Sequence, residues 1–334
     1  MRSLSVILPT YNRRNLLDLV LHGLSKQSFR DFDVIVVVRP ANDGTEDLVA
    51  QYRNTLDIKT VFQKTGYVTN ALNLGLRVAT GDIIDFLDDD AVPAEDLLQR
   101  HVEAYEKLDI AGVAGDVVSS KLCNGKLEAV HEKEESPFLY PLSRLGLSLW
   151  NKPLPGAQGH FTYVTKSGYV ASLGNMAYWR KNGSIKSFLG MGANMSVLRK
   201  AIVGFNFQDQ SKLGAGWEQI LAWYIWKQGY TLIFDPKAKV FHVTHGETLS
   251  RELSGRKKAA FQTEMELLFY RLYGKEKGLS VMYRLVSLMY DSMLALKKKE
   301  LRCLRGKFEG NVLGFRQFLR GTFKSSYDRL LILR

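Results

Sequence analysis

Four strand-like segments, each followed by a helical pattern, fill the first 115 residues and constrain the fold more than any other feature. The strand-like segments read LSVILP, DVIVVV, DIKTVFQ and DIIDFLD. After the first of them, Leu17, Leu21 and Leu24 recur at the spacing of one helix face over residues 13–27. Strands separated by helices of this length join through right-handed crossovers. The pattern therefore predicts an α/β fold, with a mostly parallel sheet covered by helices on both faces.

Three consecutive carboxylates, Asp88, Asp89 and Asp90, directly follow the fourth strand-like segment, where ligands of such sheets bind. One of them could cap the next helix, but a cap needs only one acid, and adjacent carboxylates repel each other unless a cation compensates them. Mg²⁺ or Mn²⁺ suits such a site, with substrate phosphates completing the coordination. The sequence thus predicts a metal site and a diphosphate substrate. Asp85 alternates to the other strand face, where a structural role is expected.

The positive charge of the chain is concentrated at its C-terminal end. Of the formal net charge of +12, residues 251–334 contribute +11, from 19 Lys and Arg against 8 Asp and Glu. Aromatic and aliphatic residues share helical stretches with these charges, as in helices that lie on an anionic membrane surface. Packing of the same helices on the rest of the protein explains the pattern equally well. Nucleic acid is not expected as a partner, because neither an RNA-binding signature nor a recognition helix is evident.

Other sequence signals are negative. No apolar run approaches the roughly 20 residues of a membrane span. The N-terminal residues lack the series of regions that marks a signal peptide, so a location in the cytoplasm or at the cytoplasmic face of the membrane is expected. Cys123 and Cys303 have no partners at metal-binding spacing, and reduced thiols are expected.

Seven motifs occur in a fixed order between residues 4 and 245. They are ILPTYN, VIVVVRPANDGTED, ALNLG, ATGDIIDFLDDD, GANMSV, GWEQ and GYTLIFDPKAKVFH. In this order the series resembles the inverting family 2 glycosyltransferases of GT-A fold. The resemblance implies a catalytic domain over residues 1–247, with a nucleotide-binding part (1–115) and an acceptor-binding part (116–247), and a helical extension over 248–334. It also implies that a UDP- or GDP-sugar donates its sugar to a hydroxyl group of a glycan or lipid-linked glycan.

The resemblance implies roles for the residues around the donor. Asp90 becomes the main metal ligand, with Asp88 also on the metal, and Asp88 and Asp89 contact ribose, metal-bound water or the sugar. His242 reaches the metal or the diphosphate, with His245 as the other candidate at that strand exit. The remaining donor contacts are expected from Pro9, Thr10, Tyr11 and Asn12 at the base and ribose, Asp43 at the base edge, Asn73 on a helix beneath the nucleotide, and Asn194 at the sugar hydroxyls. A plain strand-to-helix turn capped by Asn12 remains the alternative for residues 9–12.

The catalytic base is expected in GWEQ. An inverting transfer needs a carboxylate on the side of the sugar opposite the diphosphate, and relatives place a Glu-Asp pair at the start of a helix there. This chain offers Glu218, with Gln219 where Asp is common. Glu218 could instead only complement the helix dipole. Trp217 is either a platform for sugar stacking or a buried core residue.

Two other classes of function are left open. A nucleotidyltransferase also uses acids and a divalent cation on an α/β sheet, but ILPTYNRR does not supply the glycine-rich N-terminal loop of that class. In a non-catalytic, membrane-associated binding protein, Gln219 would mark an inactive site.

Overall fold

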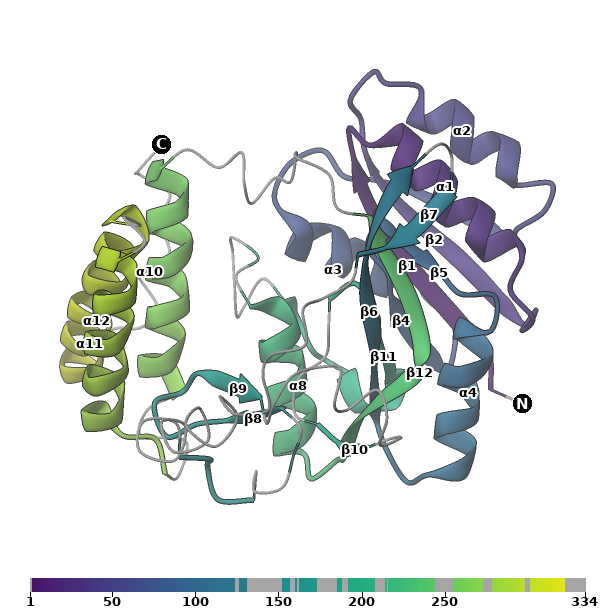
Figure 1. Cartoon of the computed structure of the whole chain (residues 1–334). Coiled ribbons are helices and arrows are strands. Elements are labelled where there is room, and N and C mark those ends of the chain that lie inside the picture. Colours follow the sequence, from purple (N-terminus) through teal and green to yellow (C-terminus); the bar gives the residue numbers. More distant parts are fainter. Residues whose placement is uncertain are drawn as a thin grey trace. The chain divides into compact units, whose positions relative to one another are not determined.

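The chain divides into two compact units, which are described separately here (Figure 1). The computed structural model describes residues 2–123, 126–130, 152–156, 160, 162–172, 185–187, 192–207, 214, 216–243, 255–272, 278–297 and 301–321. Unit 1 comprises residues 1–134, 174–209 and 217–245, and unit 2 comprises 135–173, 210–216 and 246–334. Much of the middle region expected to bind the acceptor, together with His245 and residues 322–334, lies outside the described residues.

Unit 1 is built on a mixed sheet whose described strands run in the order β10-β12-β6-β11-β4-β1-β2-β3, with β5 pairing β12 and β7 pairing β6. The strands are β1 (Leu4–Tyr11), β2 (Phe32–Arg39), β3 (Ile58–Phe62), β4 (Ile83–Phe86), β5 (Ala91–Pro93), β6 (Gly112–Cys123), β7 (Lys126–Ala129), β10 (Ile185–Lys186), β11 (Met195–Leu198) and β12 (Leu232–Val243). β1 pairs in parallel with β2 and β4, β2 with β3, and β6 with β12, whereas β11 runs antiparallel to both of its neighbours. The predicted α/β fold with a mostly parallel sheet is confirmed.

Helices cover both faces of this sheet, as predicted (Figure 1). They are α1 (Arg14–Ser25), α2 (Thr45–Tyr52), α3 (Val68–Val78), α4 (Leu97–Lys107), the 3-10 helix η1 (Arg199–Ile202) and α8 (Trp217–Lys227). α1 buries Leu17, Leu21 and Leu24, the face that the sequence spacing predicts. The centre of β2, residues 34–38, is fully buried, because helices lie on both sides of it.

Unit 2 contains the short antiparallel pair β8 (Thr162–Val164) and β9 (Val170–Ser172) and three long helices. The helices are α10 (Gly255–Leu272), α11 (Val281–Lys297) and α12 (Leu301–Arg320), which confirms the helical reading of the C-terminal residues that the structure describes. Within those residues, no helix combines the length and apolarity that crossing a bilayer requires.

Candidate active site

Asp88, Asp89 and Asp90 form the turn between β4 and β5, at the carboxyl end of β4. β5 then pairs with β12, which places Ala91 opposite His242. As a result, Nε2 of His242 lies 3.2 Å from Oδ1 of Asp90, and the backbone N–H of Val243 donates to the carbonyl of Asp90 at 2.8 Å. One ligand atom each from Asp88, Asp90 and His242 lies within 4.8 Å of the others. The fold therefore assembles the three residues for which a metal contact is expected.

Burial and mutual repulsion shift the pKa values of the acids in this cluster. Burial and repulsion from Asp90 and Asp89 raise the pKa of Asp88 to about 7. Burial also raises the pKa of Asp89, against the opposing effect of Arg13. The hydrogen bond with Asp90 raises the pKa of His242 above its ordinary value. Each of these raised pKa values indicates that added positive charge stabilises the site.

Arg13, a residue not predicted from the sequence, supplies part of that positive charge. Its Nη1 donates to Oδ1 of Asp89 at 2.8 Å and to Oδ2 of Asp90 at 3.1 Å. Thr10 donates to the other oxygen of Asp89 at 2.8 Å. Both oxygens of Asp89 are thus held by the protein, so this carboxylate anchors the turn; its expected contact with ribose, metal-bound water or the sugar stays a prediction. The available signal was positional, because Thr10 lies near the end of β1 and Arg13 follows it, and β1 is the parallel neighbour of β4.

We expect Arg13→Gln to lower the free energy of unfolding by about 1 to 3 kcal/mol, because two buried carboxylates lose their cationic partner. Urea denaturation without divalent cation measures the loss. Arg14→Gln is the matched control, since Arg14 shows no ion pair with the acids among the described contacts. Equal stability of the two variants would contradict this account of Arg13.

The end of β1 and the loop after β2 lie side by side, because Tyr11 pairs with Arg39 in the parallel register. The Arg39 guanidinium lies over the Tyr11 ring, 4.7 Å from its centroid. Asn12 adopts a left-handed φ of 53°, and α1 begins without a side-chain cap, so Asn12 forms the turn but does not cap the helix. Residues 9–12 thus form the end of β1 and the turn after it, at the edge of the sheet where the acids lie.

Asp43 closes the loop between β2 and α2. Its carboxylate accepts hydrogen bonds from the backbone N–H groups of Arg14 (3.3 Å) and Thr45 (3.2 Å). Burial alone would raise the pKa of Asp43, but these hydrogen bonds outweigh it and the pKa is lowered. Asp43 therefore stays ionised next to the residues that follow β1.

Glu218 lies in the first turn of α8 and is half-buried. Burial raises its pKa, and its negative charge is one of the causes that raise the pKa of Asp88. The carboxylate is therefore near the acidic cluster and is a better proton acceptor than an exposed Glu at neutral pH. Gln219, beside it, is also half-buried.

Trp217 is a core residue, not an exposed platform. It is 7% exposed, and its ring packs edge-on against Phe86 (centroids 5.4 Å apart) and Phe207 (5.6 Å). A Cβ on Gly192 would lie 2.9 Å from the Trp217 ring, so that glycine permits the packing. Of the two roles considered for Trp217, the structure favours the buried one, and the sugar-stacking role is withdrawn.

The expected contact of Asn194 with sugar hydroxyls is also wrong. Its side chain is 1% exposed, and its amide N–H groups donate to the carbonyls of Asp116 and Ala238, both at 3.0 Å. Its amide oxygen lies 2.9 Å from Nε2 of His101. Asn194 thus cross-links β6, β12 and α4, and burial lowers the pKa of His101 to about 4, which keeps that imidazole neutral.

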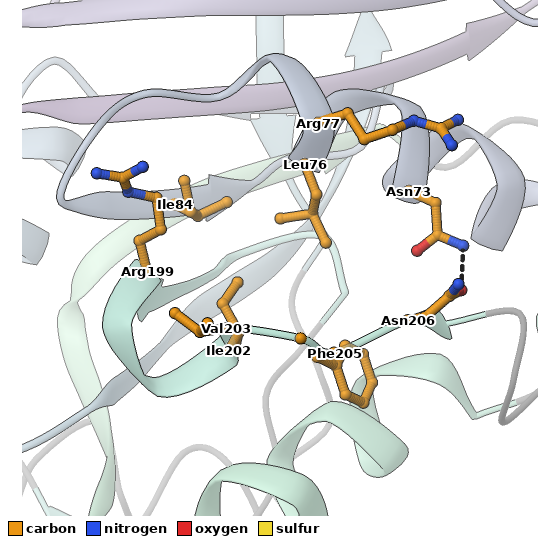
Figure 2. Close-up of a pocket in the computed structure, with 10 residues that line it drawn as sticks. Asn73, Leu76, Arg77, Ile84, Arg199, Ile202, Val203, Phe205 and Asn206 are labelled. Atoms are coloured by element: carbon orange, nitrogen blue, oxygen red, sulfur yellow. Dashed lines mark hydrogen bonds between the residues drawn. The ribbon is translucent and has the colours of Figure 1, made fainter.

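Asn73 lies at a cavity of about 300 Å³ between α3 and residues 199–206, not at the acidic cluster. Figure 2 shows its amide facing Asn206, to which Nδ2 donates at 2.8 Å. The Asn73 oxygen accepts the backbone N–H of Phe207 at 3.1 Å. These bonds make Asn73 a support of the segment that carries Phe207, rather than the expected contact beneath the nucleotide.

The sequence and the structure are similar to those of known glycosyltransferases. The sequence model described as glycosyl transferase family 2 matches residues 5–169. Validoxylamine A glucosyltransferase of Streptomyces hygroscopicus subsp. jinggangensis is 32% identical over 209 residues, which cover 57% of this chain and 48% of that protein. The chain thus spans about half the length of this relative.

Two solved structures share the fold. Mannosyltransferase PcManGT from Pyrobaculum calidifontis, in complex with GDP-Man and Mn²⁺, superimposes with a TM-score of 0.54 at 17% identity, over 94% of this chain and 87% of its own. TarS 1–349 of S. aureus, in complex with UDP-GlcNAc, superimposes with a TM-score of 0.51 at 18% identity, over 81% and 67%. At these identities the likeness concerns the fold. Residues 5–169 thus match glycosyl transferase family 2, and the fold is that of GT-A glycosyltransferases.

Proposed function

We infer that this protein transfers a sugar from a nucleoside-diphosphate donor to a hydroxyl acceptor, with inversion at the anomeric carbon and with a divalent cation. The observation that carries the inference is the assembly of Asp88, Asp90 and His242 beside Glu218, at the carboxyl end of β4. Cation and base are the two parts that such a displacement needs on opposite sides of the sugar.

Asp88, Asp90 and His242 fit a divalent cation. Their ligand atoms lie within 4.8 Å of one another, and mutual repulsion of the acids raises the pKa of Asp88, so binding a cation would relieve this repulsion. When bound, the cation neutralises charge that develops on the departing diphosphate. Mn²⁺ or Mg²⁺ satisfies the carboxylates, and the imidazole of His242 favours Mn²⁺, because Mg²⁺ prefers oxygen ligands.

The nucleotide is placed at the edge formed by residues 9–12 and the loop of Asp43. Tyr11 offers a ring next to this edge, and the ionised Asp43 is an acceptor for the N–H groups of a base. A UDP- or GDP-sugar donor is supported by the solved relatives, whose titles name GDP-Man and UDP-GlcNAc. A glycan or lipid-linked glycan is the acceptor class we propose, in keeping with the sequence resemblance.

Glu218 accepts the proton of the acceptor hydroxyl. At the same time the hydroxyl oxygen attacks the anomeric carbon, and the bond from that carbon to the diphosphate breaks. Partial burial, which raises the pKa of Glu218, suits this role, since the proton is taken up at the moment of bond formation. Arg13 holds the turn of Asp89 and Asp90 in place for the donor.

A panel of UDP- and GDP-sugars, tested with Mn²⁺ for release of the nucleoside diphosphate and for thermal stabilisation, tests the proposal. One donor is expected to stabilise the protein and to be consumed. Stabilisation by a donor without turnover, with or without acceptor glycans, would instead favour the non-catalytic binding protein.

A further inference from the structure

The helices of unit 2 expose large apolar side chains along two stripes. On α11 the stripe comprises Met282, Leu285, Met289 and Met293, and on α12 it comprises Phe308, Val312, Phe315 and Leu319. Both sets recur at spacings of three and four residues, so each occupies one face of its helix. Met289 is 69% exposed and Leu319 is 67% exposed. Apolar surface gathered in this way, unlike a single exposed residue, indicates an interaction site.

The orientation of α12 about its own axis is fixed by glycines that pack on α10. Gly306, Gly310 and Gly314 recur every four residues. A Cβ on them would lie 2.3 Å from the Ala259 carbonyl oxygen, 2.5 Å from Glu266 and 2.4 Å from Tyr270, respectively. No side chain fits at these distances, so α12 must turn its glycine face to α10. At 3.6 residues per turn the apolar stripe of α12 lies on the opposite face, and it cannot rotate inward.

The orientation of α11 is fixed by a buried arginine. Arg284 is 1% exposed, donates to the Ser167 carbonyl at 2.8 Å, forms an ion pair with Glu266 of α10, and lies over the Tyr169 ring, 3.8 Å from its centroid. Glu266 also accepts from Asn311 of α12 at 2.9 Å. Removing Arg284 from this network would leave a buried charge unpaired. The inward position of Arg284 holds the methionine-rich stripe of α11 outward.

Positive charge borders the apolar stripe of α12. Arg305, Arg316 and Arg320 are exposed, and on a helical projection they fall along one side of the stripe. The α12 segment contains five basic residues and one acid, Glu309, which pairs with Arg305 at 2.7 Å. Residues 251–334 as a whole carry a net charge of +11. Apolar side chains bordered by arginines match a lipid bilayer, in which apolar acyl chains lie beneath anionic headgroups.

We propose that the exposed faces of α11 and α12 bind an anionic membrane surface, with the two apolar stripes entering the headgroup region and the arginines contacting lipid phosphates. This mode needs no spanning segment, because the helices lie in the plane of the interface. A second copy of the chain fits less well, since it would bring two arginine-bordered faces together. The proposal does not depend on the transferase activity.

Co-sedimentation of the full chain with vesicles tests the proposal. Vesicles containing phosphatidylglycerol should bind the protein, vesicles of phosphatidylcholine alone should bind it much less, and salt should weaken the binding. Met289→Glu combined with Leu319→Glu should reduce binding about tenfold or more, because both side chains would carry charge into the interface. Val203→Glu, at a 73% exposed apolar position of unit 1, is the matched control and should bind as the unchanged protein does.

Arg316→Gln combined with Arg320→Gln tests the electrostatic contribution to membrane binding separately from the apolar one. This variant should lose the preference for phosphatidylglycerol. Circular dichroism checks that each variant is folded. The proposal is overturned if the folded Glu variant binds as well as the Val203→Glu control, or if the unchanged protein binds neither kind of vesicle. It is also overturned if light scattering shows a dimer that the Glu variant dissociates while vesicle binding is absent.

Discussion

Asp90→Asn is expected to lower the rate of sugar transfer by about 10²- to 10³-fold, the largest metal-related effect available in this protein. The substitution keeps the size of the side chain and removes the charge that would hold the cation. Asp90 is 3% exposed, and its Oδ1 lies 3.2 Å from Nε2 of His242. Because the position is buried, no acid on the exposed surface can take the place of Asp90. The rate of nucleoside diphosphate release with saturating donor measures the effect. Asp109→Asn makes the same change at an exposed position and serves as the control.

Metal binding gives a second readout of the same variant. Mn²⁺ should raise the melting temperature of the unchanged protein, because a ligand that binds only the folded state stabilises it. This increase should be absent in Asp90→Asn. The pKa of Asp88 is raised to about 7, so protons compete with the metal below that pH, and the apparent Mn²⁺ affinity should fall as the pH drops through it. An Asp90→Asn protein that transfers sugar at the full rate and responds to Mn²⁺ as the unchanged protein does would show that Asp90 is not a metal ligand.

Glu218→Gln is expected to lower the transfer rate by about 10²- to 10⁴-fold while donor binding and stabilisation by Mn²⁺ persist. The reason is that the amide can contact the acceptor hydroxyl but cannot accept its proton. In the unchanged protein, with Mn²⁺ kept saturating so that protons at Asp88 do not limit the rate, activity should fall as the pH drops through the pKa of Glu218, which burial raises above the ordinary value of 4.5. This acidic limb should disappear from the residual activity of the variant.

Glu106→Gln, at an exposed position of α4, is the control for this substitution. A Glu218→Gln protein with full activity and an unchanged pH profile would mean that another group takes the proton. Loss of donor binding in that variant would mean instead that Glu218 acts on the donor. The absence of Asp at position 219 makes this experiment the most informative for the catalytic assignment.

Much of the first half of the fold could be predicted from the sequence because its signals are local. The alternation of strands and helices predicted the parallel β1, β2, β3 and β4, and the spacing of leucines predicted the buried face of α1. The position of three acids after a buried strand predicted an acidic cluster at a strand end. Each of these signals depends on residues a few positions apart, where geometry follows directly from helix and strand periodicity.

Misassigned residues were those whose surroundings come from distant parts of the chain. Asn194 was expected at the sugar, and a sugar-stacking platform was one of the two roles considered for Trp217. The aromatic packing of Trp217 and the three hydrogen-bond partners of Asn194 place both in the interior. Residue type alone could not reveal this, since an indole or an amide serves equally well in a core or in a pocket once its polar atoms are satisfied.

The sequence by itself determined the α/β framework, the acids at the end of β4 and the basic character of residues 251–334. Only the tertiary structure decided what surrounds them. The pairing of β1 with β4 brings Arg13 to the acids, and the pairing of β5 with β12 brings His242 to Asp90. The glycines of α12 decide which face of that helix is exposed. The physical reason is that charge compensation and close packing act between atoms that touch, and contact between distant residues is set by strand order and helix packing.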